Sequence, residues 1–231
     1  MSRARVPPPI LIFFVIDLAL GIAYVANYLA GQPFGHLTAF LDLDGEANLP
    51  TWYSSIQWFC VAILLGVFAQ YNFTLSQGKS WPLLLLPLVF LALSLDEVAH
   101  IHEQLGKKVD LLILGGTRTN TPFRWTGIWM FVIGIPFLAA LAALLLSLRA
   151  YLKDAPGALF KIVLGMAVML AGAIGIEILS NFVDHQSAYG VAQVFAEESF
   201  EMFGATIVLW GSYELVCTEG LSLRIGRIET R

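Results

Sequence analysis

The chain has 231 residues, of which 58% are hydrophobic and 13% are charged, and its net charge is −4. Soluble domains are about half apolar and about a quarter charged, so this composition excludes an ordinary soluble protein and predicts an integral membrane protein. The acidic net charge and the lack of a basic stripe argue against a nucleic-acid partner.

Six segments are apolar and long enough to cross a membrane as helices, which takes about 20 residues. They cover residues 10–30, 52–73, 81–105, 125–148, 159–184 and 192–216. We therefore expect an all-α, polytopic membrane protein, in which residues 1–231 form a single domain built as a bundle of six transmembrane helices. The first segment is too long and, at Asp17, too polar for a cleaved signal peptide, so we expect it to be retained.

Basic residues are divided unevenly between the two sides of this predicted bundle. The side that holds both termini carries nine: Arg3, Arg5, Lys79, Arg149, Lys153, Lys161, Arg224, Arg227 and Arg231. The opposite side carries four: Lys107, Lys108, Arg118 and Arg124. Because cytoplasmic loops are enriched in Lys and Arg, we expect an integral protein of the cell membrane with both termini in the cytoplasm.

Ionisable side chains interrupt three predicted spans at their outer ends. The third span ends in SLDEVAHIHEQLG (94–106), the fifth ends in IEILSNFVDH (176–185), and the sixth begins with FAEESFEMFG (195–204). An ionisable group inside a bilayer is costly unless it pairs, binds a metal or lines water. The three sets therefore predict one shared polar site on the extracytoplasmic side.

These polar clusters contain no Lys or Arg, so the expected counter-charge is a divalent metal ion, either iron or zinc. Glu97-x-x-His100 matches one half of a di-iron bundle site, which uses Glu and Glu-x-x-His on facing helices. The predicted metal ligands are Glu97, His100, Glu103, Glu177, His185, Glu197 and Glu201. The predicted acid/base groups are Asp96, Glu198 and Asp184, and Asn181 is expected to orient ligands. Haem ligation by His100 and His185 would leave the carboxylates unexplained.

Three functions fit this pattern. The leading one is a metal-dependent membrane enzyme that carries out di-iron redox chemistry or zinc-dependent hydrolysis. A divalent cation transporter would need a polar path inward, and Asp17, about 10 Å into the first span at 1.5 Å per residue, is its candidate station. An accessory subunit of a larger membrane complex would use the acids only as hydrogen-bonded links between helices. Membrane lipid is the expected partner, together with another membrane protein or a second copy of the chain.

The third loop contains a further apolar run, Val109 to Leu114, directly after two lysines. Such a run within a polar connection is typical of a segment that lies on the membrane surface. It could equally fold over the predicted polar site. Both placements remain open at the level of the sequence.

The segment LDLDGEANLPTWYSS (41–55), followed by SLDEVAHIHEQLG, resembles a group of bacterial multipass membrane proteins that lack an assigned activity. The resemblance covers most of the chain. It implies a location in the bacterial inner membrane but no function. Asp96 to His100 is similar to the His-Glu-x-x-His pattern of zinc proteases, with Asp in place of the first His. SNFVD (180–184) and DEVAH (96–100) are similar to the paired motifs of ZIP-type zinc transporters, in reversed order. Three histidines and Ser54 and Ser55 are reminiscent of ceramidase-type hydrolases, without their spacing.

Overall fold

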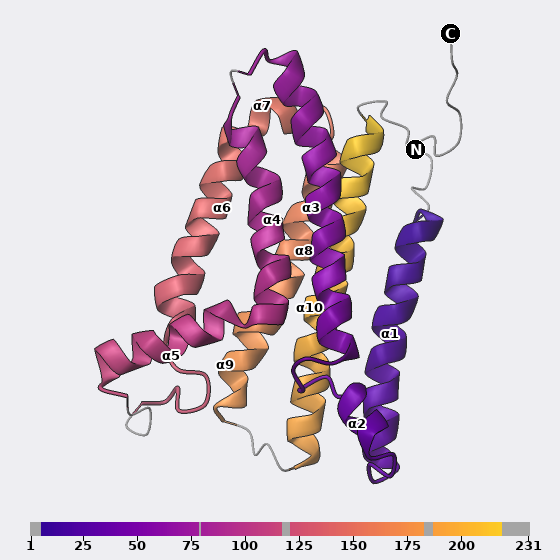
Figure 1. Cartoon of the computed structure of the whole chain (residues 1–231), viewed down its shortest axis with the longest axis vertical. Coiled ribbons are helices and arrows are strands. Elements are labelled where there is room, and N and C mark those ends of the chain that lie inside the picture. The colour runs from indigo at the N-terminus through magenta and orange to yellow at the C-terminus, as the bar shows by residue number, and fades with distance from the viewer. Residues whose placement is uncertain (1–5, 79, 117–120, 183–186, 219–231) are drawn as a thin grey trace.

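A computed structural model describes residues 6–78, 80–116, 121–182 and 187–218 of the protein (Figure 1). These residues form helices and no strands, which confirms the all-α prediction. The long helices run side by side along the length of the molecule, and the start of the first and the end of the last lie at the same end of the bundle (Figure 1). Two short helices, α2 (His36–Phe40) and α5 (Ile101–Leu114), lie toward the opposite end (Figure 1).

The long helices are α1 (Pro8–Leu29), α3 (Leu49–Leu75), α4 (Pro82–Ala99), α6 (Ile135–Ser147), α8 (Pro156–Leu170) and α10 (Ala188–Thr218). A π-helical turn, η1 (Met130–Gly134), precedes α6, and α8 continues through η2 (Ala171–Ile176) into α9 (Glu177–Ser180). The short helices are α2 (His36–Phe40), α5 (Ile101–Leu114) and α7 (Arg149–Leu152). Most long helices carry Pro in the first turn, where its missing N–H costs no hydrogen bond.

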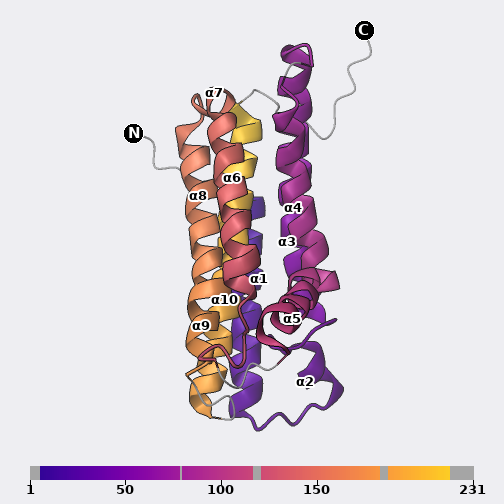
Figure 2. The ribbon, with the colours of Figure 1, turned by 90° about the vertical axis from the view of Figure 1, so that its left-hand side faces the viewer.

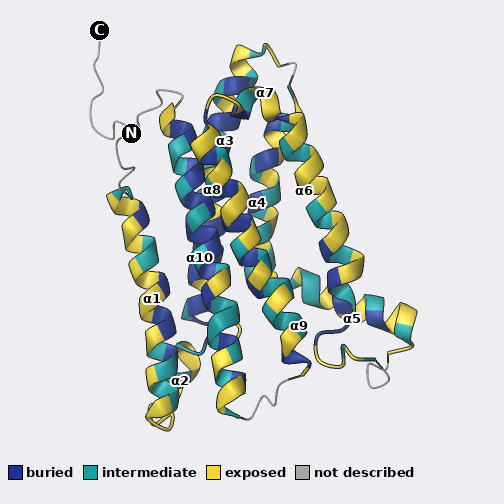
Figure 3. Cartoon of the chain, turned by 180° about the vertical axis from the view of Figure 1, so that it is seen from behind, coloured by how far each residue is buried: buried dark blue, intermediate teal, exposed yellow. Residues whose placement is uncertain are grey.

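Five described helices are long and apolar enough to cross a membrane, rather than the six that the sequence predicts. They are Pro8–Leu29, Leu49–Leu75, Pro82–Ala99, Met130–Ser147 and Pro156–Ser180. The sixth predicted span is a helix, α10, but acidic residues interrupt its apolar sequence. Its position explains this composition. It packs against α8, α3 and α1, and Figure 3 shows it mainly buried in its upper part and partly exposed at its lower end, so its glutamates are half-buried against protein.

The contact between α8 and α10 depends on glycines from both helices. A Cβ atom at Gly204 would lie 2.5 Å from the backbone nitrogen of Met169, and one at Gly165 would lie 2.6 Å from the carbonyl oxygen of Gly204. A Cβ at Gly211 would lie 2.7 Å from the carbonyl oxygen of Ala158. Small residues thus allow the two backbones to touch, as in helix pairs within membranes.

The third predicted span, residues 81–105, is not one continuous helix. His100 adopts a left-handed conformation (φ 48°, ψ 43°), which ends α4 at Ala99 and starts α5 at Ile101 in a new direction. Figure 1 shows α5 turning away from α4 across the end of the bundle, and the side view in Figure 2 agrees. The prediction that helical spacing continues from Glu97 through Glu103 is therefore wrong, because one residue changes the chain direction.

Candidate metal centre

The acidic loop before α3 is folded back on itself by Asn48. The side-chain amide of Asn48 donates to the carbonyl oxygens of Asp42 (2.6 Å) and Gly45 (2.8 Å), and its oxygen accepts from the backbone N–H of Thr51 (3.2 Å). An Asn in this role caps the first turn of α3 and closes the loop at the same time. Glu46 therefore lies at a defined place beside the end of the bundle.

The kink at His100 is held by Asp96, one turn earlier on α4. One oxygen of Asp96 accepts from the backbone N–H of His102 (2.8 Å), and the other lies 2.6 Å from Nδ1 of the same histidine. The first bond satisfies one of the unpaired N–H groups at the start of α5. The ring of His102 also packs against Trp129, with ring centroids 4.8 Å apart. Asp96 thus fixes the angle between α4 and α5.

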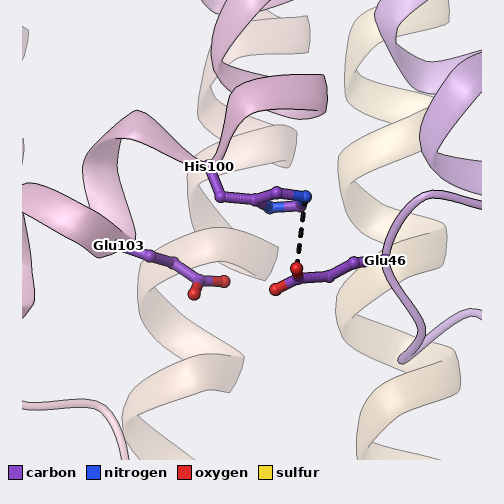
Figure 4. A group of neighbouring side chains, drawn as sticks. All are labelled: Glu46, His100 and Glu103. Carbon is purple, nitrogen blue, oxygen red and sulfur yellow. Dashed lines mark ion pairs between the residues drawn. The ribbon is translucent and has the colours of Figure 1, made fainter.

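This kink brings His100 next to two glutamates from other segments. Nε2 of His100 lies 3.5 Å from a carboxylate oxygen of Glu46, and Glu103 follows one turn into α5. Figure 4 shows the three side chains pointing toward one another from α4, α5 and the loop. One ligand atom from each residue lies within 4.8 Å of the other two, which is close enough for a single metal ion to bridge them.

The triad of Glu46, His100 and Glu103 is open to solvent. The exposed fraction of the side chain is 22% for His100 and 56% for Glu46. Glu103 additionally accepts a hydrogen bond from Lys107, one turn later on α5, at 3.2 Å. Catalytic zinc sites combine three nitrogen or oxygen ligands with one open position. The triad provides this number of ligands and leaves access for a water molecule or a substrate.

The remaining predicted acids gather deeper in the bundle, in a second group that we call the inner acidic cluster. Glu201 of α10 is subject to electrostatic repulsion from four other glutamates: Glu97, Glu177, Glu197 and Glu198. Two of the carboxylates are held by indoles, because Trp58 donates to Glu97 (3.2 Å) and Trp129 donates to Glu177 (3.3 Å). Acids from three helices therefore influence one another electrostatically, but among the described residues they do not form a second compact ligand set.

The outcome for each predicted residue follows from these two groups. His100 and Glu103 belong to the triad. Asp96 positions His102, and the side-chain oxygen of Asn181 accepts a hydrogen bond from the backbone N–H of Trp125 (3.0 Å). Both residues therefore connect separate segments of the chain. The inner acidic cluster contains Glu97, Glu177, Glu197, Glu198 and Glu201. Asp184 and His185 lie outside the described residues.

Glu46 was missed by the sequence prediction. It lies far from His100 along the chain, in a loop rather than in a predicted span, and no helical spacing connects the two. The only available signal is that LDLDGEANLP carries three acids and no base. Because this acidic loop is predicted at the same end of the bundle as the polar helix ends, its acids could have been included among the predicted metal ligands.

Asp17 is isolated from both groups. Its carboxylate accepts hydrogen bonds from Tyr53 (2.7 Å), Gln57 (2.9 Å) and Thr206 (2.8 Å), and only 1% of the residue is exposed. These donors belong to α3 and α10, so the contacts join three helices. A buried acid with three donors is well satisfied by the protein itself.

Two ionisable groups outside the spans show shifted pKa values. Burial alone would lower the pKa of His102, but the hydrogen bond and negative charge of Asp96 raise it above its ordinary value. Burial raises the pKa of Asp42, and the nearby charge of Asp44 adds to this effect. Negative charge is therefore concentrated locally, around His102 and around Asp42.

Comparison with known proteins identifies the family of this chain. Residues 10–217 match the family described as Domain of unknown function (DUF8692), so the match covers nearly every described helix. No curated protein and no solved structure matches the chain. The family match is thus consistent with the expectation of an uncharacterised family and adds no activity to the geometry above. The chain belongs to the DUF8692 family.

Proposed function

We propose that this protein binds a divalent metal ion at one end of a membrane-spanning bundle and uses it for metal-dependent chemistry at the membrane surface. The observation that carries the proposal is the convergence of Glu46, His100 and Glu103, whose ligand atoms lie within 4.8 Å of one another. The three come from separate elements, and a strained backbone conformation at His100 is required to bring them together.

The donor set favours a single ion over a di-iron pair. One imidazole and two carboxylates suit zinc, manganese or ferrous iron. The di-iron reading requires Glu97 and His100 to bind together, whereas Glu97 accepts a hydrogen bond from Trp58 and His100 faces Glu46. A zinc ion held by three ligands would lower the pKa of a bound water to about 7, which is the basis of zinc-dependent hydrolysis. We therefore place hydrolysis ahead of redox chemistry.

The transporter reading receives less support. It would use Asp17 as a station on an inward path, but this carboxylate is sealed from solvent and occupied by three donors. The reading as a purely structural subunit explains Asp17 and Asn181 well. It does not explain why an exposed acid, Glu46, and a half-buried acid, Glu103, lie around one histidine, since a solvent-accessible acid needs no protein partner.

Metal binding by the purified protein tests the proposal. We expect zinc or manganese to bind in a one-to-one ratio, and Glu46→Gln and Glu103→Gln each to reduce the affinity by at least tenfold. Asp44→Asn is the matched control, because Asp44 is an exposed acid of the same loop outside the triad. Elemental analysis and calorimetry provide the measurement. Unchanged binding in the Glu46→Gln/Glu103→Gln double variant would refute the site.

A liposome assay separates the enzyme from the transporter. Liposomes that contain the protein and a trapped zinc-sensitive dye should show no protein-dependent rise in fluorescence after zinc is added outside. A rise that Glu46→Gln abolishes would establish transport through the same triad and overturn the proposed chemistry.

A further inference from the structure

Helix α5 presents a regular stripe of residues that no described part of the protein covers. Ile101, Leu105, Lys108 and Leu112 follow the spacing i, i+4, i+7 and i+11, so they share one face of the helix. All four are exposed, and Leu112 is 84% exposed. Three of them are large apolar side chains, and their exposure to water is unfavourable.

The opposite face of α5 is packed against the bundle, which fixes the direction of the stripe. His102 stacks on Trp129, a Cβ at Gly106 would lie 2.8 Å from Cβ of Trp129, and Asp110 accepts from the backbone N–H of Ile128 (3.1 Å). The stripe therefore points away from the protein. In Figures 1 and 2, α5 extends sideways from the end of α4, while α1 and α10 continue past its level.

One lysine lies on this exposed face of α5, and a second lies beside it on the side of the helix that carries Glu103. Lys108 lies within the stripe, between Leu105 and Leu112, and Lys107 is its exposed neighbour. A lysine within an apolar stripe can bury its hydrocarbon stem and extend its ammonium group to the polar layer of a membrane. Helices with this combination of residues lie in the interface of a bilayer and favour anionic lipids.

We propose that α5 is an interfacial helix that binds an anionic phospholipid, with Ile101, Leu105 and Leu112 among the acyl chains and Lys107 and Lys108 on the phosphate. Lys107 also bonds Glu103 of the triad at 3.2 Å, so a lipid held there places its headgroup beside the candidate metal centre. The link to a metal rests on the proposed function, whereas the lipid binding does not.

Native mass spectrometry of the detergent-solubilised full chain tests the lipid preference, with chelator present so that the result is independent of metal. In an equimolar mixture we expect phosphatidylglycerol to bind in preference to phosphatidylcholine, and Lys107→Gln/Lys108→Gln to reduce this preference about fivefold or more. Lys153→Gln is the control, because Lys153 is exposed and directly follows α7, which lies at the opposite end of the bundle (Figure 1). Equal preference in wild type and double variant would overturn the proposal, as would displacement of the lipid by inorganic phosphate alone.

A fluorescent probe on Leu112→Cys, in a background without Cys60 and Cys217, tests the insertion of the stripe. In nanodiscs that contain phosphatidylglycerol we expect blue-shifted emission that is quenched by lipids labelled near the headgroup. Emission typical of water would overturn the insertion. Emission that is blue-shifted but insensitive to the lipid quencher and dependent on protein concentration would assign the stripe to a second copy, and would overturn it as well.

Discussion

The carboxylate of Asp96 contacts His102 twice. One oxygen accepts from the backbone N–H of His102 at 2.8 Å, and the other lies 2.6 Å from Nδ1 of the same residue. The pair spans the left-handed residue His100 and connects the last turn of α4 to the first turn of α5. Since His100 and Glu103 lie on the two sides of this connection, the geometry of the triad depends on a bond between two residues outside it.

Replacement of Asp96 should therefore weaken metal binding without removing a ligand. Outer partners of this kind typically affect metal affinity by about 10- to 100-fold, and we expect Asp96→Ala to fall in this range. Calorimetric titration with zinc is the measurement. Asp96→Asn should retain part of the affinity, because its amide oxygen can still accept from the N–H of His102. An affinity equal to that of wild type in Asp96→Ala would show that the kink is maintained by other contacts.

His100 combines a ligand role with backbone strain, and two variants separate them. His100→Gly and His100→Ala should both lose metal binding, since both lack the imidazole. Glycine adopts the left-handed conformation without penalty, whereas alanine pays about 1 kcal/mol there. Thermal unfolding under metal-free conditions should accordingly show the alanine variant as the less stable of the two. The reverse order would mean that His100 is not left-handed in the protein.

Lys107 should compete with a metal ion for Glu103. Its bond to Glu103 joins residues one turn apart on an exposed surface, an arrangement worth about 0.3–0.5 kcal/mol. Lys107→Gln should therefore raise metal affinity about twofold at low salt, and the gain should disappear as salt increases. Lys108→Gln, which changes the same charge without an observed contact to Glu103, is the control. A decrease in affinity for Lys107→Gln would place the lysine in support of the site.

Asp17 should contribute to stability and not to metal binding. Asp17→Asn places a donor amide where three donors already point, and an unsatisfied buried polar group costs about 1–3 kcal/mol. We expect a lower unfolding temperature with unchanged zinc affinity. Thr206→Ser keeps the hydroxyl donor and should be milder. Loss of metal from a well-folded Asp17→Asn protein would reopen the transporter reading.

The α8–α10 contact gives a test of the fold itself. Gly204→Ala would force a methyl group against the backbone of Met169, and overpacking of this kind costs about 1–3 kcal/mol. At Gly175 an added Cβ meets nothing within 4 Å, so Gly175→Ala should leave stability unchanged or slightly increased. Unfolding in mild detergent compares the two. Equal stability of both variants would contradict the close approach of the helices.

The sequence by itself determined the helical class, the positions of the apolar segments and the end of the bundle at which ionisable residues gather. Each of these depends on local composition. About 20 apolar residues suffice to define a span, and an ionisable residue within such a span is easily recognised in the sequence. For the same reason, composition could not establish that α10 packs against α8, α3 and α1. These neighbours half-bury its glutamates, and this is a property of packing.

Only the tertiary structure decided which polar residues meet. Helical spacing placed Glu97 beside His100, but the left-handed backbone at His100 turns the chain. As a result, Glu97 accepts a hydrogen bond from Trp58, and His100 lies next to Glu46. A single residue with positive φ carries little signal in a sequence, since His is found there less often than Gly or Asn. The partnership with Glu46 depends on a loop folded by Asn48 and on the packing of α3 against α4, and neither follows from periodicity.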